Sequence, residues 1–222
     1  LAIRSCCEGL MDTVGQIVMI IAAGYVIGAF PTGYLVGRHL GVNIFEIGSG
    51  NMGATNIIRA SGGIGWGIFV WALDSLKGII AILVAGQIMP EHTVTATVIG
   101  AISAIVGHNW SLFIALITGR VRGGKGAATA FGTLFMIVPL YIIAAMLVIG
   151  GLIVAATRYV SLAVLLMFGM ATLWVIVLTT QQLVPWEYAV YLMVIAAMIM
   201  FRFRDNIQRL IAGTERRLGE HT

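Results

Sequence analysis

The sequence predicts an all-α membrane protein, and three observations support this fold class. Of the 222 residues, 59% are hydrophobic and only 10% are charged, and the mean hydropathy is +1.00. Apolar runs recur that are near or above the ~20 residues a helix needs to cross the hydrocarbon core. Basic residues gather in particular segments between these runs. A soluble globular protein needs more polar surface than this composition supplies, so that class is excluded.

The candidate spans are the apolar stretches at 15–38, 64–88, 93–117, 127–156, 159–180 and 185–203. The fourth stretch is either one tilted helix or two short helices separated near Pro139, because proline disfavours helical geometry in the residue before it. The first alternative gives six spans, and the second gives seven.

The charge distribution favours the divided stretch. With seven spans, one side of the membrane carries Arg38, Arg59, Arg120, Arg122, Lys125, Arg158 and the five arginines that follow residue 201. The other side carries Arg4 and the acids Glu8, Asp12, Glu91 and Glu187. The positive-inside rule therefore predicts seven transmembrane helices in one domain, 1–222, with the N-terminus outside and the C-terminus inside.

This topology places three polar segments together at the cytoplasmic face, at 48–59, 119–126 and 202–209. The first, Gly-Ser-Gly-Asn-Met-Gly-Ala-Thr-Asn followed by Ile-Ile-Arg, predicts a glycine turn that opens a helix and presents free N–H groups. The second, Gly-Arg-Val-Arg-Gly-Gly-Lys-Gly, combines glycine amides with cations. Such convergence indicates a site for a phosphate or carboxylate substrate.

Several other functional classes are excluded. The second segment has the spacing of a nucleotide-binding P-loop as far as Lys125, but Gly126 stands where Ser or Thr would hold magnesium. The histidine–aspartate dyad of many acyltransferases is absent, and no metal-ligand spacing is present, so neither a metal nor a cofactor is expected. The net charge of +4 is explained by topology rather than by nucleic-acid binding.

Two polar features lie within the spans. Asp74 and Lys77 are one helical turn apart, which predicts a buried salt bridge. His108, beside Asn109, is either a hydrogen-bonded structural residue or a catalytic one, and both interpretations remain open. Cys6 and Cys7 are adjacent and form neither a disulfide framework nor a metal-ligand pattern.

A set of motifs in fixed order resembles one known family. These are Gly48 to Asn56 with Arg59, Asp74-Ser-Leu-Lys-Gly78, Gly107-His108, Gly123-Gly-Lys-Gly126 with Ala128-Thr129, Thr157-Arg-Tyr159 with Ser161, and Asn206-Ile207 with Arg209-Leu210, Gly213 and Glu215. They are similar to the bacterial integral-membrane acyl-phosphate:glycerol-3-phosphate acyltransferases, the PlsY family. The resemblance covers residues from about 24 to 217.

The resemblance implies a seven-span enzyme of the bacterial inner (plasma) membrane, with a cytoplasmic active site and no cofactor. The enzyme would transfer an acyl group from acyl phosphate to the sn-1 hydroxyl of glycerol 3-phosphate and give lysophosphatidic acid for phospholipid synthesis. Its partners would be these substrates, membrane lipid and an enzyme that forms acyl phosphate. It implies catalytic roles for Lys125, His108 and Asn206. It implies substrate binding by Ser49, Gly50, Asn51, Gly53, Thr55, Asn56, Arg59, Gly123, Gly124, Gly126, Thr129, Ser161 and Arg204.

The sequence departs from the family pattern where polar residues are usual. Ala29 replaces Ser, Asn43-Ile-Phe45 replaces Asp-Ile-Arg, and Phe203 replaces the His of His-Arg-x-Asn. Two alternatives therefore accompany the acyltransferase hypothesis. One is a non-catalytic or altered-activity paralogue that binds acyl phosphate or glycerol 3-phosphate. The other is a small-anion transporter that uses the same basic segments.

Overall fold

The computed structural model describes residues 2–220, with side chains from residue 11 onward, so Cys6 and Cys7 lie outside the described side chains. The described residues form eleven α-helices and one short 3₁₀ helix, Pro90–His92. Four segments are long and apolar enough to cross a bilayer: Met11–His39, Ile64–Ile88, Leu140–Thr157 and Val160–Thr180. A fifth, Trp186–Arg202 with Arg204–Ile211, qualifies if this pair, bent by 64°, is counted as one span.

Three predicted spans agree closely with single helices. The stretch 64–88 is α4 (Ile64–Ile88), 159–180 is α9 (Val160–Thr180), and 185–203 is α10 (Trp186–Arg202). After α10 the chain turns sharply into the short helix α11 (Arg204–Ile211).

The stretch 127–156 divides as the charge distribution predicts. It forms α7 (Ala127–Ile137) and α8 (Leu140–Thr157), and Val138 before Pro139 has extended backbone angles. Proline disfavours helical geometry in the preceding residue, which explains the break. The 11 residues of α7 are fewer than the ~20 that a helix needs to cross the hydrocarbon core alone.

Two further predicted spans contain a break in the helix. The first, 15–38, lies within the single apolar segment Met11–His39 but is interrupted between α1 (Ala2–Ala29) and α2 (Thr32–His39), and the third divides into α5 (Thr93–Asn109) and α6 (Leu112–Thr118). Side chains distant in sequence satisfy the carbonyl groups that these breaks release. Ser111 Oγ donates to the carbonyl of Ala29 (2.6 Å), and Lys77 Nζ donates to that of Phe30 (3.0 Å). The Tyr25 hydroxyl donates to Trp110 (2.6 Å), so tertiary contacts permit the breaks.

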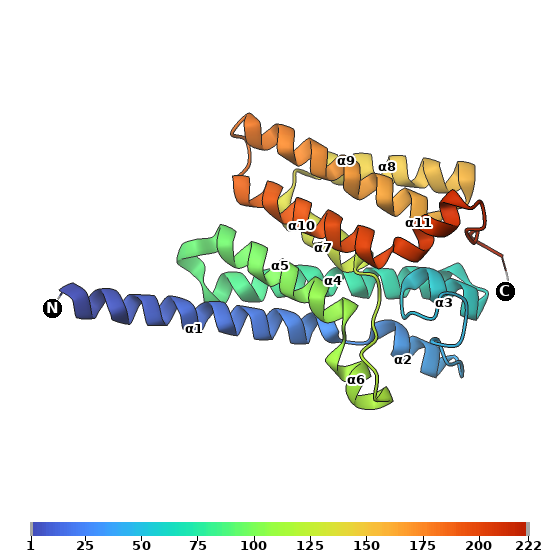
Figure 1. The fold of residues 1–222 in the computed structure, drawn as a ribbon, viewed down its shortest axis with the longest axis horizontal. Helices are drawn as coiled ribbons and strands as arrows, with labels where there is room; N and C mark the ends of the chain where they lie inside the picture. The colour runs from blue at the N-terminus through green and yellow to red at the C-terminus, as the bar shows by residue number, and fades with distance from the viewer. Residues whose placement is uncertain (1, 221–222) are drawn as a thin grey trace.

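The helices pack in two groups with a pair of helices between them. Figure 1 shows α1, α4 and α5 side by side, α8 and α9 together on the opposite flank, and α7 and α10 between these groups. The main buried core includes Phe131, Leu134, Ile142, Tyr191 and Ile195 from the two central helices and α8. The short helices α2, α3 (Ala54–Ser61) and α11 lie toward the end of the bundle that carries the C-terminus.

Close helix approach depends on glycines in the spans. A Cβ added to Gly107 on α5 would lie 2.1 Å from the carbonyl oxygen of Tyr25, and one added to Gly132 on α7 would lie 1.9 Å from that of Ser75. Only a residue without a side chain allows these backbones to meet, as is common between helices in membranes.

Candidate active site

A cavity of about 440 Å³ opens at the bundle end where the polar segments meet. Its polar end is lined by the 48–59 segment, the 119–126 segment, the start of α9 and the chain around α11. Its apolar end runs between α8 and α9 on one side and α4 and α7 on the other. The volume falls within the ~300–1,000 Å³ typical of small-molecule sites.

The first glycine segment is organised by one buried side chain, that of Asn56. Its amide nitrogen donates to the carbonyls of Ile44 (3.0 Å), Ile47 (3.0 Å) and Asn51 (2.8 Å), and its Oδ1 accepts from the Ser49 amide (3.0 Å). The Asn56 side chain is therefore committed to holding the loop. The turn also needs Gly48, whose φ is +55° and whose added Cβ would lie 2.5 Å from Asn56 Oδ1.

This loop delivers the N-terminus of α3 to the cavity. Ala54 and Thr55, the first residues of α3, line the cavity, and their amides lie before the first intrahelical bonds. Arg59 and Arg216 line the same region. Burial and, next, the charge of Arg216 lower the pKa of Arg59 below its usual value. A helix N-terminus and two arginines that line one cavity are a suitable site for one phosphate group.

The second glycine segment, 123–126, lies directly against α5. A Cβ on Gly123 would lie 2.2 Å from the His108 carbonyl oxygen, and one on Gly124 would lie 1.9 Å from His108 Nε2. The Gly124 amide donates to the His108 carbonyl (3.0 Å). Both glycines are thus required by the close approach of this loop to the helix.

The loop leads into the N-terminus of α7. Gly126, with φ of +82°, is the N-cap, and the next two residues, Ala127 and Ala128, line the cavity. Lys125 stands immediately before this helix start and also lines the cavity. Unpaired amides, the positive end of the helix dipole and an ammonium group together form a second anion site.

Lys125 is fixed by two side chains that follow α10. Its ammonium donates a hydrogen bond to Asn206 Oδ1 and lies over the Phe203 ring, 4.7 Å from the ring centroid. Burial, and next the charge of Arg209, lower the pKa of Lys125 to about 8. Glu215 opposes this shift. The cavity therefore holds a cation whose charge is adjustable close to neutral pH.

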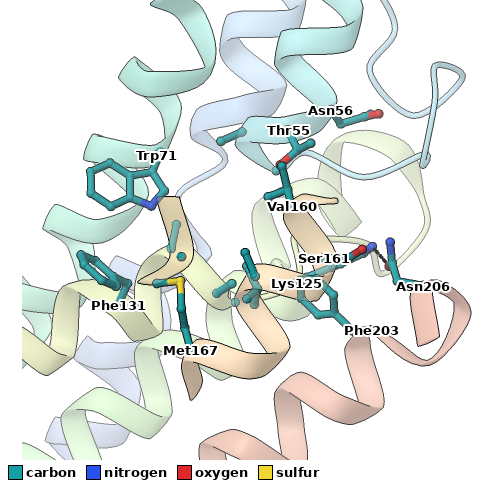
Figure 2. A pocket seen from close by; sticks show the side chains of 18 of the residues that line it. Thr55, Asn56, Trp71, Lys125, Phe131, Val160, Ser161, Met167, Phe203 and Asn206 are labelled. Carbon is teal, nitrogen blue, oxygen red and sulfur yellow. Dashed lines mark hydrogen bonds between the residues drawn. The ribbon is translucent and has the colours of Figure 1, made fainter. Parts of the chain in front are cut away.

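Glu215 connects the helices around the polar end. Its Oε1 accepts from Ser161 Oγ (3.1 Å) and from Asn206 Nδ2 (2.7 Å), and its Oε2 accepts from Arg209 Nε (2.8 Å). This buried carboxylate thereby links α9, α11 and, through Asn206, the 123–126 loop that carries Lys125, here called the lysine loop. Figure 2 shows Ser161, Phe203 and Asn206 gathered close to Lys125.

The apolar end of the cavity is a groove between helices. Trp71 and Phe131 form one wall, with ring centroids 5.3 Å apart, and Met167 faces them from α9 (Figure 2). Leu147, Gly150, Gly151 and Val154 of α8 and Val164 and Phe168 of α9 also line it. Such a surface accommodates a hydrocarbon chain and would leave a charged group without polar partners.

Beneath the lysine loop lies a buried polar cluster. Asp74 and Lys77 form the predicted salt bridge at 2.8 Å, and Asp74 Oδ1 lies 3.8 Å from His108 Nδ1. Asp74 and His108 both line the cavity, whereas Lys77 donates to the break between α1 and α2. Within the described chain, no three His, Cys, Asp or Glu side chains gather in a way that holds a metal ion.

The structure brings most of the predicted site residues to one cavity. Those that line it are Ser49, Asn51, Gly53, Thr55, Asn56, Arg59, His108, Lys125, Gly126, Ser161 and Asn206. Gly50, Gly123, Gly124, Thr129 and Arg204 are not among its lining residues. Thr129 is fully buried, and Arg204 is exposed with its guanidinium over the Phe201 ring.

The four residues that depart from the family pattern all make defined packing or hydrogen-bond contacts. Ala29 is fully buried, and Asn43 closes its turn through Glu46 Oε1 (2.6 Å) and the Phe45 amide (3.3 Å). Phe45 lies under the Arg122 guanidinium, 5.3 Å from the ring centroid, as Phe203 lies under Lys125. Cations from the 119–126 segment therefore lie over both phenyl rings.

The apolar lining residues, Arg216 and Glu215 were not predicted to belong to the site, although Glu215 is one of the family motif residues. Trp71, Phe131 and Met167 resemble the many apolar residues that face lipid, so no local signal separates them. A glutamate among the arginines after α11 was the one available signal for a buried carboxylate.

Comparison with known proteins gives consistent matches. The model of a family described as "Glycerol-3-phosphate acyltransferase" matches residues 18–213. Glycerol-3-phosphate acyltransferase 2 of Moorella thermoacetica is 40% identical over 203 residues, which cover 91% of this chain and 97% of that protein. A glycerol-3-phosphate acyltransferase of Thermus thermophilus is 42% identical over 199 residues, covering 88% and 92%.

Solved structures agree with these relatives. A crystal structure of PlsY (YgiH), an integral membrane glycerol 3-phosphate acyltransferase in its glycerol 3-phosphate form, superposes with a TM-score of 0.79 at 32% identity. The alignment covers 90% of this chain and 94% of that one. The lysophosphatidic acid form of the same enzyme gives a TM-score of 0.77.

Proposed function

The chain belongs to the glycerol-3-phosphate acyltransferase family, and on that premise we propose that it transfers an acyl group from acyl phosphate to the sn-1 hydroxyl of glycerol 3-phosphate. The product is lysophosphatidic acid. The observation that carries this proposal is a single cavity with two anion sites and one apolar groove. Two phosphate-bearing substrates, one with a hydrocarbon chain, need that combination.

The two anion sites take different substrates. The site at the N-terminus of α7, with Lys125, adjoins Phe131 of the apolar groove and suits the phosphate of the acyl donor. The site at the N-terminus of α3, with Arg59 and Arg216, suits glycerol 3-phosphate, which has no apolar part. Ser161 and Asn206 lie near Lys125 and help to orient the reacting groups (Figure 2).

The reaction requires positioning and charge neutralisation more than a strong base. The glycerol hydroxyl oxygen attacks the acyl carbonyl carbon, the bond from that carbon to the phosphate oxygen breaks, and inorganic phosphate leaves. The hydroxyl proton passes to a phosphate oxygen, so no side chain must keep it. Lys125 and the α7 amides stabilise the negative charge that develops on the leaving phosphate.

The same proposal includes a topology of seven spans in one domain, 1–222, with the N-terminus outside and the C-terminus inside the bacterial inner membrane. In this arrangement the cavity faces the cytoplasm, where glycerol 3-phosphate and an acyl-phosphate-forming partner enzyme are available. Support comes from the basic segments, which meet at one end of the bundle, and from the reversal between α7 and α8. That reversal returns Arg158 to the side that holds Lys125.

Neither alternative function is favoured. The positions of Ala29, Asn43, Phe45 and Phe203 are occupied by packed or turn-forming residues, and the cavity keeps Lys125 at one anion site and Arg59 with Arg216 at the other. A transporter requires a polar path through the bundle, whereas the cavity becomes apolar as it passes between α8 and α9.

Purified protein in lipid nanodiscs tests the proposal. Palmitoyl phosphate with glycerol 3-phosphate is expected to yield equal amounts of inorganic phosphate and lysophosphatidic acid, and palmitoyl-CoA is expected to yield no product. Absence of product from folded protein with palmitoyl phosphate would reject the reaction, and transfer from palmitoyl-CoA alone would reject the donor.

A variant extends this test to the groove. A Cβ on Gly151 meets no atom within 4 Å, so Gly151→Leu adds bulk to the groove without disturbing the helix packing. We expect transfer from palmitoyl phosphate to fall about tenfold, which corresponds to ~1.4 kcal/mol, and transfer from butyryl phosphate to be unchanged.

A further inference from the structure

Two adjacent residues at the end of α10 hold two adjacent residues of the lysine loop. Arg202 Nη2 donates to the carbonyl of Gly124 (2.6 Å), and the Phe203 ring lies beneath the Lys125 ammonium at 4.7 Å. The Arg202 guanidinium also lies over the Trp110 ring, 5.3 Å from its centroid. The end of α10 therefore holds the loop in addition to its contact with His108.

The Phe203 ring differs in kind from the other partner of Lys125. Asn206 accepts one N–H of the ammonium group, and the face of a phenyl ring attracts the cation without forming a directional hydrogen bond. Phe203 is only 6% exposed, so its ring also keeps water from that side of the ammonium. The remaining N–H groups are left for a ligand in the cavity that Lys125 lines.

We propose that Phe203 is a positioning residue for Lys125: its ring holds the ammonium in its charged form and directs it toward the phosphate of the acyl donor. This inference rests on the proposed function for the identity of that phosphate. The attraction between ring and cation itself does not depend on it. Phe203 touches neither reacting atom, so its effect passes through Lys125.

The neighbouring charges define what the ring must do. Arg59 and Arg209 disfavour the charged form of Lys125, and Glu215 and Asp205 favour it. Phe203→Leu removes the negative face of the ring but leaves a bulky apolar side chain in its place, so with these charges unchanged it lowers the pKa of Lys125 further. A substitution with a purely structural effect has no reason to move this pKa in that direction.

The chain permits a direct measurement because its only lysines are Lys77 and Lys125. Protein labelled at lysine Cε and Nζ gives one signal for each, and Lys77, buried beside Asp74, serves as the internal reference. We expect Phe203→Leu to lower the pKa of Lys125 by about half a unit or more, and to raise the KM for palmitoyl phosphate three- to tenfold. Phe203→Tyr, which keeps the ring, should restore both.

The matched control is Phe201→Leu. Like Phe203, Phe201 lies under a cation: the Arg204 guanidinium is 4.8 Å from its ring centroid. Its side chain, however, is 55% exposed and does not line the cavity. We expect Phe201→Leu to leave the Lys125 titration and the KM unchanged. An equal response in the two leucine variants would overturn the proposal.

Phenylalanine analogues with one to three ring fluorines at position 203 keep the shape of the ring and weaken its negative face. The pKa of Lys125 is expected to fall with each fluorine, and a constant value across the series would refute the role of the ring even if Phe203→Leu does not fold. Wild-type protein that transfers no acyl group would reject the proposed function and leave this titration series decisive.

Discussion

The two glycine loops of the cavity are held in place in opposite ways. The 48–56 loop is organised from within, because Asn56 bonds to four backbone groups of residues 44–51. The 123–126 loop is held from outside, by the His108 carbonyl, Arg202, Phe203 and Asn206. The first loop therefore keeps its shape through local sequence, and the second has its shape only in the assembled bundle.

This difference matches the task of each loop. The internally organised loop presents backbone amides at the start of α3, and backbone positions are best fixed by local bonds. The externally held loop presents the long Lys125 side chain, whose tip must be placed relative to groups on α9 and α11. Variants at each loop can separate these two kinds of support.

The largest effect is expected from Lys125→Ala. In the proposed reaction Lys125 neutralises the leaving phosphate, so without its ammonium kcat should fall about 100- to 1,000-fold. Arg120→Ala is the matched control, because Arg120 belongs to the same segment, is exposed and does not line the cavity. Steady-state phosphate release measures both variants, and an equal loss in the two would show that general loop charge is what matters.

Asn56→Ala should break the first loop. It leaves three carbonyls and one amide of the loop without partners, at a cost of about 3 kcal/mol in the free energy of unfolding. The thermal midpoint in detergent, followed by tryptophan fluorescence, should fall by roughly 6–12 °C. Asn206→Ala should instead reduce activity with a smaller change in midpoint. An unchanged midpoint in Asn56→Ala would contradict internal organisation of the loop.

Activity should decline above about pH 8, where Lys125 loses its charge. The expected loss of kcat/KM is about tenfold per pH unit beyond that pKa, because only the charged fraction is active. Stability should change in the opposite sense. The pKa in the folded state is below the usual 10.5, so the unfolded chain binds more protons between these values and this group's contribution to stability rises with pH. Parallel activity and thermal-midpoint profiles test both signs, and a midpoint that falls with activity would instead indicate unfolding.

The smallest effect is expected from Phe45→Leu, which removes the ring beneath Arg122 and thus one contact between the loops. Because neither residue lines the cavity, the effect should be small. We expect a two- to fivefold rise in the KM for glycerol 3-phosphate, the equivalent of ~0.5–1 kcal/mol. Arg122→Leu should have the same effect, and the double variant should add little. Fully additive losses would show that the two side chains act independently.

The parts of the fold that local signals determine were predictable from sequence. Pro139 ended α7 as expected, Asp74 and Lys77 formed their salt bridge, and the glycine loop opened α3. The breaks at Pro31 and after Asn109 were not predicted, because the side chains that bond to the released carbonyls lie elsewhere in the chain. An apolar run shows no sign of such a partner.

The site was predictable to a similar degree. Glycines, cations and Asn206 were recognisable as polar exceptions in an apolar chain, and most of them line the cavity. The contact between Phe203 and Lys125 could not be predicted. A phenylalanine near the end of a span is ordinary, and the cation that it contacts lies 78 positions earlier in the chain. The backbone hydrogen bonds of the Asn56 side chain were not predicted either, because they join residues of a loop whose shape the sequence does not show.

The apolar groove has a consequence for how the product departs. Trp71 on α4 and Leu147 on α8 both line the cavity and remain 37% and 49% exposed, so the groove is not closed over between these two helices. Moving a methylene from hydrocarbon to water costs about 0.8 kcal/mol, or roughly 12 kcal/mol for about fifteen of them. An acyl chain that leaves sideways between α4 and α8 would avoid this cost. In the proposed reaction, the bilayer is thus the solvent that receives the acyl chain of the product.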